Sequence, residues 1–205
     1  MNKKQLAMLL SELETFDESK TGLEQYQTNC EIAAEILWDL EMQGEIEGKV
    51  IADFGCGNGI FGVGCLILNA EKVHFVDVDE EAIKICTSNI HKMKEIHHSQ
   101  FDFEAFHGDV KKFDKKVDVV IENPPFGVKK EHADREFLLK AMETSDKIIS
   151  MHKIESKTFI EKLSKDHGFE AKLIKKIKFP LKKIKGYHKK KVYNVDVGVW
   201  KIEKK

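Results

Sequence analysis

A glycine-rich loop between two apolar segments restricts the fold of this chain more than any other part of its sequence. Residues 49–54 form a short apolar run, the loop Gly55–Gly59 follows, and an apolar helical stretch continues to Ala70. A strand, a glycine loop and a helix in this order open an α/β sheet whose ligands bind beyond the carboxyl ends of the strands. We therefore expect a ligand site at this loop.

Strand-like and helix-like segments keep alternating after the loop. We expect strands at residues 73–79, 101–107, 117–121 and 148–152, and helices at 80–96, 133–145 and 156–167. Two long β-like segments, 170–184 and 192–202, then indicate an antiparallel hairpin at one edge. The sequence thus predicts an α/β fold, a Rossmann-like, doubly wound and mostly parallel sheet of seven strands.

Two amphipathic helices are expected before the first strand. Leucines recur at helical spacing from Leu6 to Leu13, and the pattern returns from Ile32 to Leu40, where either Thr28 or Asn29 is suited to cap the helix. We interpret residues 1–205 as a single domain. It comprises a helical part (1–45), a cofactor-binding core (46–168) and a basic hairpin (169–205).

Composition narrows the class of protein. The longest apolar run, residues 60–70, is too short to cross a bilayer, so we expect no membrane association. We expect a cytoplasmic protein, or a nuclear one in a eukaryote. The four cysteines match neither a zinc pair nor a disulfide framework and are expected to be reduced and mostly buried. The nine histidines show no metal-binding spacing, so no metal is predicted.

Charge is distributed unevenly along the chain. Residues 171–205 contain 13 lysines and two acidic residues, a net charge of +11, whereas the whole chain carries −1. A basic segment of this kind commonly binds phosphate, although a lysine-rich solvated strand face is an equally ordinary explanation. The segment alone does not decide between them.

The loop also determines which cofactor the chain favours. Residues 57–62 satisfy the GxGxxG pattern of dinucleotide sites, but that pattern is weak by itself. Asp53 at the mouth of the loop would repel a pyrophosphate and attract a cationic aminoacyl group. We therefore expect S-adenosylmethionine, whose methionine end is zwitterionic.

Two further acidic residues follow predicted strands. Asp77 ends the second strand, where a carboxylate can accept hydrogen bonds from both ribose hydroxyls, and we favour it over Asp79. Asp109 follows the third strand and is placed to bind the adenine amine while the Val110 backbone covers the ring. The alternative for Asp109 is a loop carboxylate that caps a turn.

The tetrapeptide Asn123-Pro124-Pro125-Phe126 ends the fourth strand and indicates the reaction class. Two prolines stiffen the backbone and remove two N–H donors, so carbonyl acceptors remain. The Asn123 side-chain oxygen and the Pro124 carbonyl can then accept both protons of a planar exocyclic amine, while Phe126 stacks on the ring. The sequence predicts methyl transfer to such an amine, with no covalent intermediate.

Four segments together resemble one family of Rossmann-type methyltransferases. They are residues 23–28, 123–127, 151–153 and 188–191. They look like the methyltransferase-like protein 5 family, and the likeness extends over nearly the whole chain. The resemblance implies N6 methylation of one adenosine in small-subunit ribosomal RNA.

The same resemblance implies which residues hold the cofactor and which perform catalysis. The implied cofactor contacts are Gln25, Thr28, Gly55, Asn58, Ile60, Asp77, Asp109 and Val110, and we add Asp53 and Gly59 from the loop. Residues 123–126 would be the catalytic motif. For Gln25 and Thr28 the alternatives are a loop polar group and a helix N-cap.

Three positions depart from the family pattern. Phe54 stands where Leu is general, Gln27 replaces an expected Pro, and Glu122 places a carboxylate beside the predicted catalytic Asn123. Only Glu122 bears on the function, because its charge either alters the field in the pocket or points away from it.

The family also implies a protein partner. The resemblance implies that eukaryotic members need a small zinc-binding activator subunit. That subunit adds a strand to the sheet edge formed by the third strand. Residues 101–106 alternate here between aromatic and other residues. An apolar edge of this kind invites strand addition, although the same phenylalanines would also suit a core beneath helices.

The basic hairpin supplies the candidate RNA contacts, which are Tyr187, His188, Lys189, Lys190 and Lys191. Methylation of a guanine 2-amino group or of a protein glutamine amide remains an alternative, because both groups are planar amines. An RNA-binding protein with an inactive pocket would lack Asp77 or the motif, and neither is missing. An NAD oxidoreductase would leave the two prolines unexplained.

Overall fold

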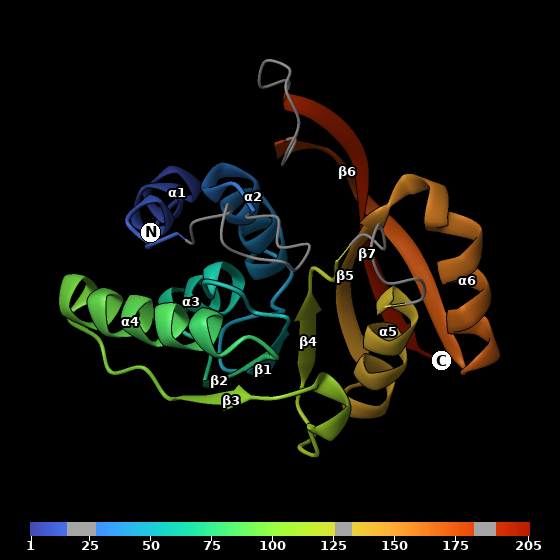
Figure 1. Cartoon of the computed structure of the whole chain (residues 1–205), viewed down its shortest axis with the longest axis horizontal. Helices are drawn as coiled ribbons and strands as arrows, with labels where there is room; N and C mark the ends of the chain where they lie inside the picture. The colour runs from blue at the N-terminus through green and yellow to red at the C-terminus, as the bar shows by residue number, and fades with distance from the viewer. Residues whose placement is uncertain (16–27, 126–132, 183–191) are drawn as a thin grey trace.

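The computed structural model describes residues 1–15, 28–125, 133–182 and 192–205 and contains one mixed sheet (Figure 1). Its seven strands lie in the order β3-β2-β1-β4-β5-β7-β6. The strands are β1 (Val50–Phe54), β2 (Lys72–Asp77), β3 (Phe103–His107), β4 (Val119–Glu122), β5 (Lys147–Lys153), β6 (Phe169–Lys182) and β7 (Val192–Lys204). Strands β1 to β5 are parallel, and β7 is antiparallel to both β5 and β6. The predicted fold class is confirmed.

Helices cover both faces of the sheet, as Figure 1 shows. One face carries α1 (Lys3–Ser11), α2 (Cys30–Glu41), α3 (Ile60–Ile67) and α4 (Glu80–His97). The other carries the 3₁₀ turn η1 (Val110–Lys112), α5 (Ala133–Thr144) and α6 (Lys157–Asp166), and a second 3₁₀ turn, η2 (Ile154–Ser156), precedes α6. Because the central strands are covered on both faces, they read as nearly continuous apolar runs.

The first strand–loop–helix unit packs tightly against its neighbour. All eight residues of α3 are buried. A Cβ built on Gly62 would lie 2.2 Å from the ring of Phe75 on β2, so only glycine lets the helix approach the sheet this closely. The glycine at this position is therefore a packing requirement, and it fixes where the loop before α3 sits.

The N-terminal helices have well-defined starts. A capping box joins Asn2 and Gln5 at the beginning of α1, whose Leu6 and Leu10 are buried. Helix α2 is capped by Asn29, whose side chain accepts from the backbone of the first turn. Of the two residues that the sequence offered as caps, Asn29 takes this role, and Thr28 is free for another.

The predicted C-terminal hairpin is present, with an order that the sequence did not reveal. β7 lies inside the sheet between β5 and β6, and β6 forms the edge. Residues 183–191, which join the two strands, lie outside the described part of the chain. β5 pairs with β7 only from residue 197 onward, so the first part of β7 and the paired end of β6 extend past the carboxyl end of β5.

The cysteines agree with the sequence prediction. All four are free, and Cys56, Cys65 and Cys86 are buried. In the described ranges, no helix is long and apolar enough to span a membrane. The same residues bring together no group of three or more His, Cys, Asp or Glu side chains that could hold a metal ion.

Candidate active site

The predicted site residues gather at one edge of the sheet. The loop Gly55–Gly59 follows β1, Asp77 ends β2, Asp109 follows β3 and Asn123 follows β4. These four strands are neighbours and parallel, so their carboxyl ends meet at the same edge. The fold thus brings together residues that are up to 68 positions apart in the chain.

Backbone conformation explains the glycines of the loop. Gly55, Gly57 and Gly59 have φ angles of +67°, +57° and +84°, in the left-handed region that L side chains rarely adopt. The loop is also held from β2, because the N–H of Gly57 donates to Asp77 Oδ2 at 2.9 Å. A tight turn fastened in this way presents backbone rather than side chains to a ligand.

Asp53 lies beneath the loop. Its carboxylate is 2% exposed and accepts a hydrogen bond from the N–H of Gly62 at 2.8 Å, which joins β1 to the first turn of α3. Burial raises the pKa of Asp53 to about 7, partly offset by that hydrogen bond. The structure therefore gives Asp53 a role in holding the loop, and its contact with an aminoacyl group stays a prediction.

Asp77 is the acidic residue nearest to the turn of the loop. Its Oδ2 accepts from Gly57, and its Oδ1 accepts from the N–H of Asp79 at 2.9 Å. Each carboxylate oxygen can accept a second hydrogen bond, so ribose binding is compatible with both contacts. Burial raises the pKa of Asp77, and the backbone hydrogen bonds oppose that shift. Asp79 instead caps α4 through Glu81.

Asp109 and Val110 lie where the chain turns after β3. Asp109 caps η1, because its Oδ1 accepts from the N–H of Lys111 at 2.9 Å. The alternative that we considered, a carboxylate that caps a turn, is thus present in the structure. Val110 is 5% exposed and belongs to the core on the α5 side. Adenine binding by these two residues stays a prediction.

Asn123 has an unusual hydrogen-bonding state. Its Nδ2 donates to Thr28 Oγ1 at 3.1 Å, whereas its Oδ1 is buried and has no partner among the described residues. A buried acceptor without a donor is costly, so this oxygen is available to accept a hydrogen bond. Thr28, predicted to contact cofactor, here orients the amide of Asn123. Gln25 and Phe126 lie outside the described residues.

Asn58 of the loop and Ile60 just after it have buried positions that the sequence did not specify. Asn58 is 5% exposed, and its Nδ2 donates to the carbonyl of Glu14, just beyond α1, at 3.1 Å. Ile60, the first residue of α3, is 7% exposed and packs in the core. Contact of either residue with a cofactor stays a prediction.

Glu122, the departure from the family pattern, is completely buried on the sheet face that α5 and α6 cover. Its Oε1 accepts from Ser150 Oγ at 2.7 Å, and the same hydroxyl lies 2.7 Å from His152 Nε2. Burial raises the pKa of Glu122 to about 8, and burial lowers the pKa of His152 to about 3. At pH 7 the group is therefore mostly a neutral carboxyl beside a neutral imidazole.

The edge strand that the activator prediction concerns is β3. It forms one end of the sheet and pairs only with β2 among the described strands. Phe101 and Phe103 pack on the core below α4, while Phe106 is 37% exposed. Phe101 and Phe103 therefore take the core alternative, and activator binding at this edge stays a prediction.

Part of the basic segment is neutralised within the fold. Lys175 bonds Glu35 and Asp39 of α2, and Lys201 bonds Glu45 at 2.8 Å. Lys176 and Lys178 of β6 are exposed. The predicted RNA contacts at residues 187–191 lie outside the described residues.

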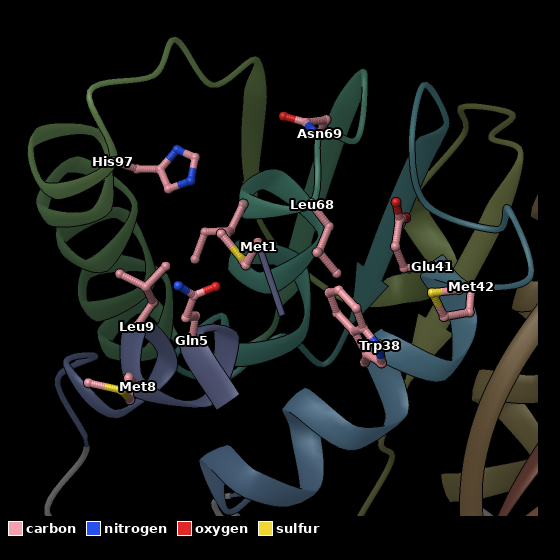
Figure 2. Close-up of a pocket in the computed structure, with 11 residues that line it drawn as sticks. Met1, Gln5, Met8, Leu9, Trp38, Glu41, Met42, Leu68, Asn69 and His97 are labelled. Carbon is pink, nitrogen blue, oxygen red and sulfur yellow. The ribbon is translucent and has the colours of Figure 1, made fainter. Parts of the chain in front are cut away.

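A separate pocket of about 870 Å³ lies at the opposite end of the helices (Figure 2). Figure 2 shows Met1 and Gln5 of the α1 region facing Leu68 at the end of α3, with Trp38 of α2 beside them. These helix ends precede the strands, whereas the predicted site lies where the strands end. The pocket is therefore not the candidate active site.

The sheet order, the glycine loop after β1 and the acidic residue that ends β2 define a Rossmann-like methyltransferase. The family model "Methyltransferase small domain" matches residues 26–149, and the chain belongs to this family. Within it, the likeness to the methyltransferase-like protein 5 family is confirmed. The rRNA N(6)-adenosine-methyltransferase METTL5 of Danio rerio is 31% identical, and the match covers 96% of each chain.

Further relatives match over their full length. An uncharacterized protein of Methanocaldococcus jannaschii is 35% identical, covering 100% of this chain and 95% of the relative. A crystal structure from Pyrococcus horikoshii, provisionally identified as an RNA methyltransferase, is 42% identical with a TM-score of 0.88 and covers 100% of this chain and 98% of its own. The chain is therefore a methyltransferase that depends on S-adenosylmethionine.

The residues present fit this cofactor. The loop offers backbone at a tight turn, and Asp77 offers acceptors for hydroxyl groups. S-adenosylmethionine supplies a methyl group attached to a positively charged sulfur. The sequence did not single out Thr28 as the partner of Asn123 or Ser150 as the partner of Glu122. The predicted cofactor and catalytic contacts stay predictions.

Proposed function

We propose that this chain methylates N6 of an adenosine in small-subunit ribosomal RNA. Relatives named rRNA N(6)-adenosine-methyltransferase support the proposal. They come from Danio rerio, Drosophila melanogaster and Caenorhabditis elegans and are 31%, 27% and 29% identical over at least 96% of this chain. The observation that carries the proposal is the buried Oδ1 of Asn123 at the carboxyl edge of the sheet, which accepts from no group in the described part of the chain.

The amide of Asn123 is suited to a planar amine. Because Thr28 Oγ1 accepts from Nδ2, the amide is oriented with Oδ1 as its remaining acceptor. Oδ1 and the Pro124 carbonyl would each accept one proton of the exocyclic amine and fix its plane. The nitrogen lone pair is then available to form the bond to the methyl carbon while the carbon–sulfur bond breaks and its electrons stay on sulfur. Phe126 would stack on the base.

Positive charge moves from sulfur to the amine nitrogen during this step. Acceptor oxygens directed at the amine stabilise the charge as it develops, since their dipoles are already oriented. The chain therefore contributes by orientation and by electrostatic stabilisation, and the proton leaves the amine after the transfer.

A guanine 2-amino group and a glutamine amide present the same planar NH₂ group. The excess of lysine in residues 171–205, with Lys176 and Lys178 exposed, supports RNA over protein as the substrate. Within RNA, the names of the relatives support adenosine. These two alternatives are the outcomes that an experiment must separate.

Ribosomal RNA from cells that lack this gene is the appropriate substrate. It is incubated with the purified protein and S-adenosylmethionine labelled in the methyl group, digested to nucleosides and separated by chromatography. We expect label in N6-methyladenosine with the unaltered chain, formed about 10² to 10³ times more slowly with Asn123→Ala. Ribosomal proteins from the same cells are assayed in parallel.

The result identifies the substrate directly. Label in 2-methylguanosine would replace adenosine by guanosine, and label in protein glutamine would overturn the RNA assignment. Binding of S-adenosylmethionine, measured for both variants, verifies that the Asn123→Ala protein is folded and loaded.

A further inference from the structure

Asn89 of α4 uses every hydrogen-bonding group of its side chain and is completely buried. Its Oδ1 accepts from the N–H of Glu14 at 2.7 Å. Its Nδ2 donates both to the carbonyl of Glu14 at 3.1 Å and to the carbonyl of Asn58 at 2.9 Å. One side chain therefore joins the segment after α1 to the cofactor loop.

Asn58 closes the same network from the loop side. Its Nδ2 donates to the carbonyl of Glu14, so that carbonyl accepts from both asparagines. Glu14, Asn58 and Asn89 thus form a closed ring of hydrogen bonds. Each lost bond would leave a buried polar group unpaired, which costs more than the bond itself contributes.

The ring supports the loop at its most deformable point. Asn58 stands between Gly57 and Gly59, both at positive φ. The carboxylates of Asp77 and Asp53 hold the loop through backbone N–H groups at 2.9 and 2.8 Å. These two bonds fix Gly57 and the first turn of α3, whereas Asn89 fixes the carbonyl between them.

The third anchor involves a part of the chain outside the matched family region. The methyltransferase family model covers residues 26–149, so α1 and Glu14 precede it. Helix α1 packs on α2 and α3 through buried leucines and brings Glu14 to the loop. A segment that precedes the matched family region therefore contributes hydrogen bonds to the loop.

We propose that Asn89 is a positioning residue of the cofactor site and that, through Glu14, it makes the N-terminal helix part of the support of the loop. The inference rests on the use of S-adenosylmethionine and does not depend on which RNA or base is methylated. It predicts that cofactor affinity falls when the hydrogen bonds between Asn89, Glu14 and the loop are removed.

The main test measures S-adenosylmethionine binding by calorimetry without any RNA. Asn89→Ala removes all three bonds of that side chain. Glu14→Pro removes the N–H that bonds Asn89 Oδ1 and keeps the Glu14 carbonyl, at an exposed position outside the helices. It also restricts the backbone of residues 13 and 14, so its fold is verified by its unfolding midpoint. We expect each variant to lower cofactor affinity by about tenfold, since a misplaced loop loses backbone contacts with its ligand. Together the two changes should lower it no further than the larger single effect.

Three control variants separate positioning from general destabilisation. Glu14→Ala keeps the backbone bonds, and Lys92→Ala removes a bond from α4 to the carbonyl of Glu12 at 2.5 Å without reaching the loop. Leu163→Ala opens a cavity under α6 on the opposite face of the sheet. All three should retain the affinity of the unaltered chain, and Leu163→Ala should do so despite a lower unfolding midpoint.

Two results would overturn the proposal. One is unchanged affinity in folded Asn89→Ala and Glu14→Pro. The other is an equal loss of affinity in Leu163→Ala, which would mean that Asn89 serves stability alone. If Asn89→Ala does not fold, the cofactor affinity of Glu14→Pro is compared with that of Glu14→Ala, and equal affinities overturn the proposal. Failure of the RNA assignment would leave all of these binding results untouched.

Discussion

Replacing Glu122 with Gln should make the protein more stable, and the gain should grow as the pH rises. Glu122 is fully buried, and its only described partner is the Ser150 hydroxyl at 2.7 Å. Gln has nearly the same shape, and its amide oxygen can accept the same hydrogen bond. The substitution therefore removes a titrating proton. Its amide NH₂ would stand where Oε2 has no partner among the described residues, a cost that is the same at every pH and does not alter the pH dependence.

The magnitude follows from the pKa of Glu122, which burial raises from 4.5 to about 8, with a smaller contribution from Asp134 of α5. Between these values the folded state holds a proton that the unfolded state has released. Stability from this group is complete below pH 4.5 and is lost as the pH rises through about 8. The loss is about 1.4 kcal/mol per pH unit. Over two pH units Glu122→Gln should gain about 2.7 kcal/mol relative to the unaltered chain.

Denaturant unfolding at pH 5.5, 6.5 and 7.5 measures this difference. Other titrating groups, such as Asp53 and His152, change both proteins alike and cancel in the comparison. Glu45→Gln is the matched control: burial raises the pKa of Glu45, but Lys147 and Lys201 outweigh it and hold that pKa below its usual value, so the group stays ionised in this range. A difference between Glu122→Gln and the unaltered chain that does not vary with pH would refute the reasoning.

Other variants test the site, the fold and the basic segment. Asp77→Ala should weaken S-adenosylmethionine binding by about 1.5 to 3 kcal/mol, as measured by calorimetry, and unchanged affinity would assign the ribose contact elsewhere. Asn123→Ala should reduce turnover by about 10² to 10³ with cofactor affinity nearly intact; a parallel loss of binding would make Asn123 a cofactor residue. Gly62→Ala should lower the unfolding midpoint, because its Cβ would lie 2.2 Å from Phe75; an unchanged midpoint would show that the helix shifts without cost. Replacing residues 189–191 by Ala should flatten the slope of log affinity for RNA against log salt concentration by the amount expected for the loss of up to about three phosphate contacts. An unchanged slope would mean that the phosphates bind elsewhere on the protein.

Local patterns were sufficient for most of the fold. Strands and helices alternate and differ in the spacing of their apolar residues. Because crossovers between parallel strands are right-handed, few sheet arrangements remain. The sheet, and the edge at which the predicted site residues gather, therefore followed from the sequence. The position of β7 did not follow, because a hairpin can join a sheet by either of its strands. That choice depends on the pairing of β5 with residues 197–203, which no local pattern records.

The surroundings of individual side chains were harder to predict. Asp53 was expected at the mouth of the loop, yet its carboxylate bonds Gly62 beneath it. The environment of Glu122 is made by β5 and α5, which are distant in sequence. Asn89 did leave a signal: it lies on the apolar stripe of α4 between Cys86 and Met93, where a polar residue needs a buried partner.

The place of β7 also has a consequence for how the chain is made. Synthesis delivers β6 before β7, yet β7 separates β6 from the rest of the sheet. Until residues 192–204 exist, the edge of β5 remains open and β6 has no neighbour in the sheet. An exposed, apolar β5 is a template for pairing with other nascent chains. We therefore expect a chain truncated before residue 192 to aggregate rather than to form a smaller enzyme.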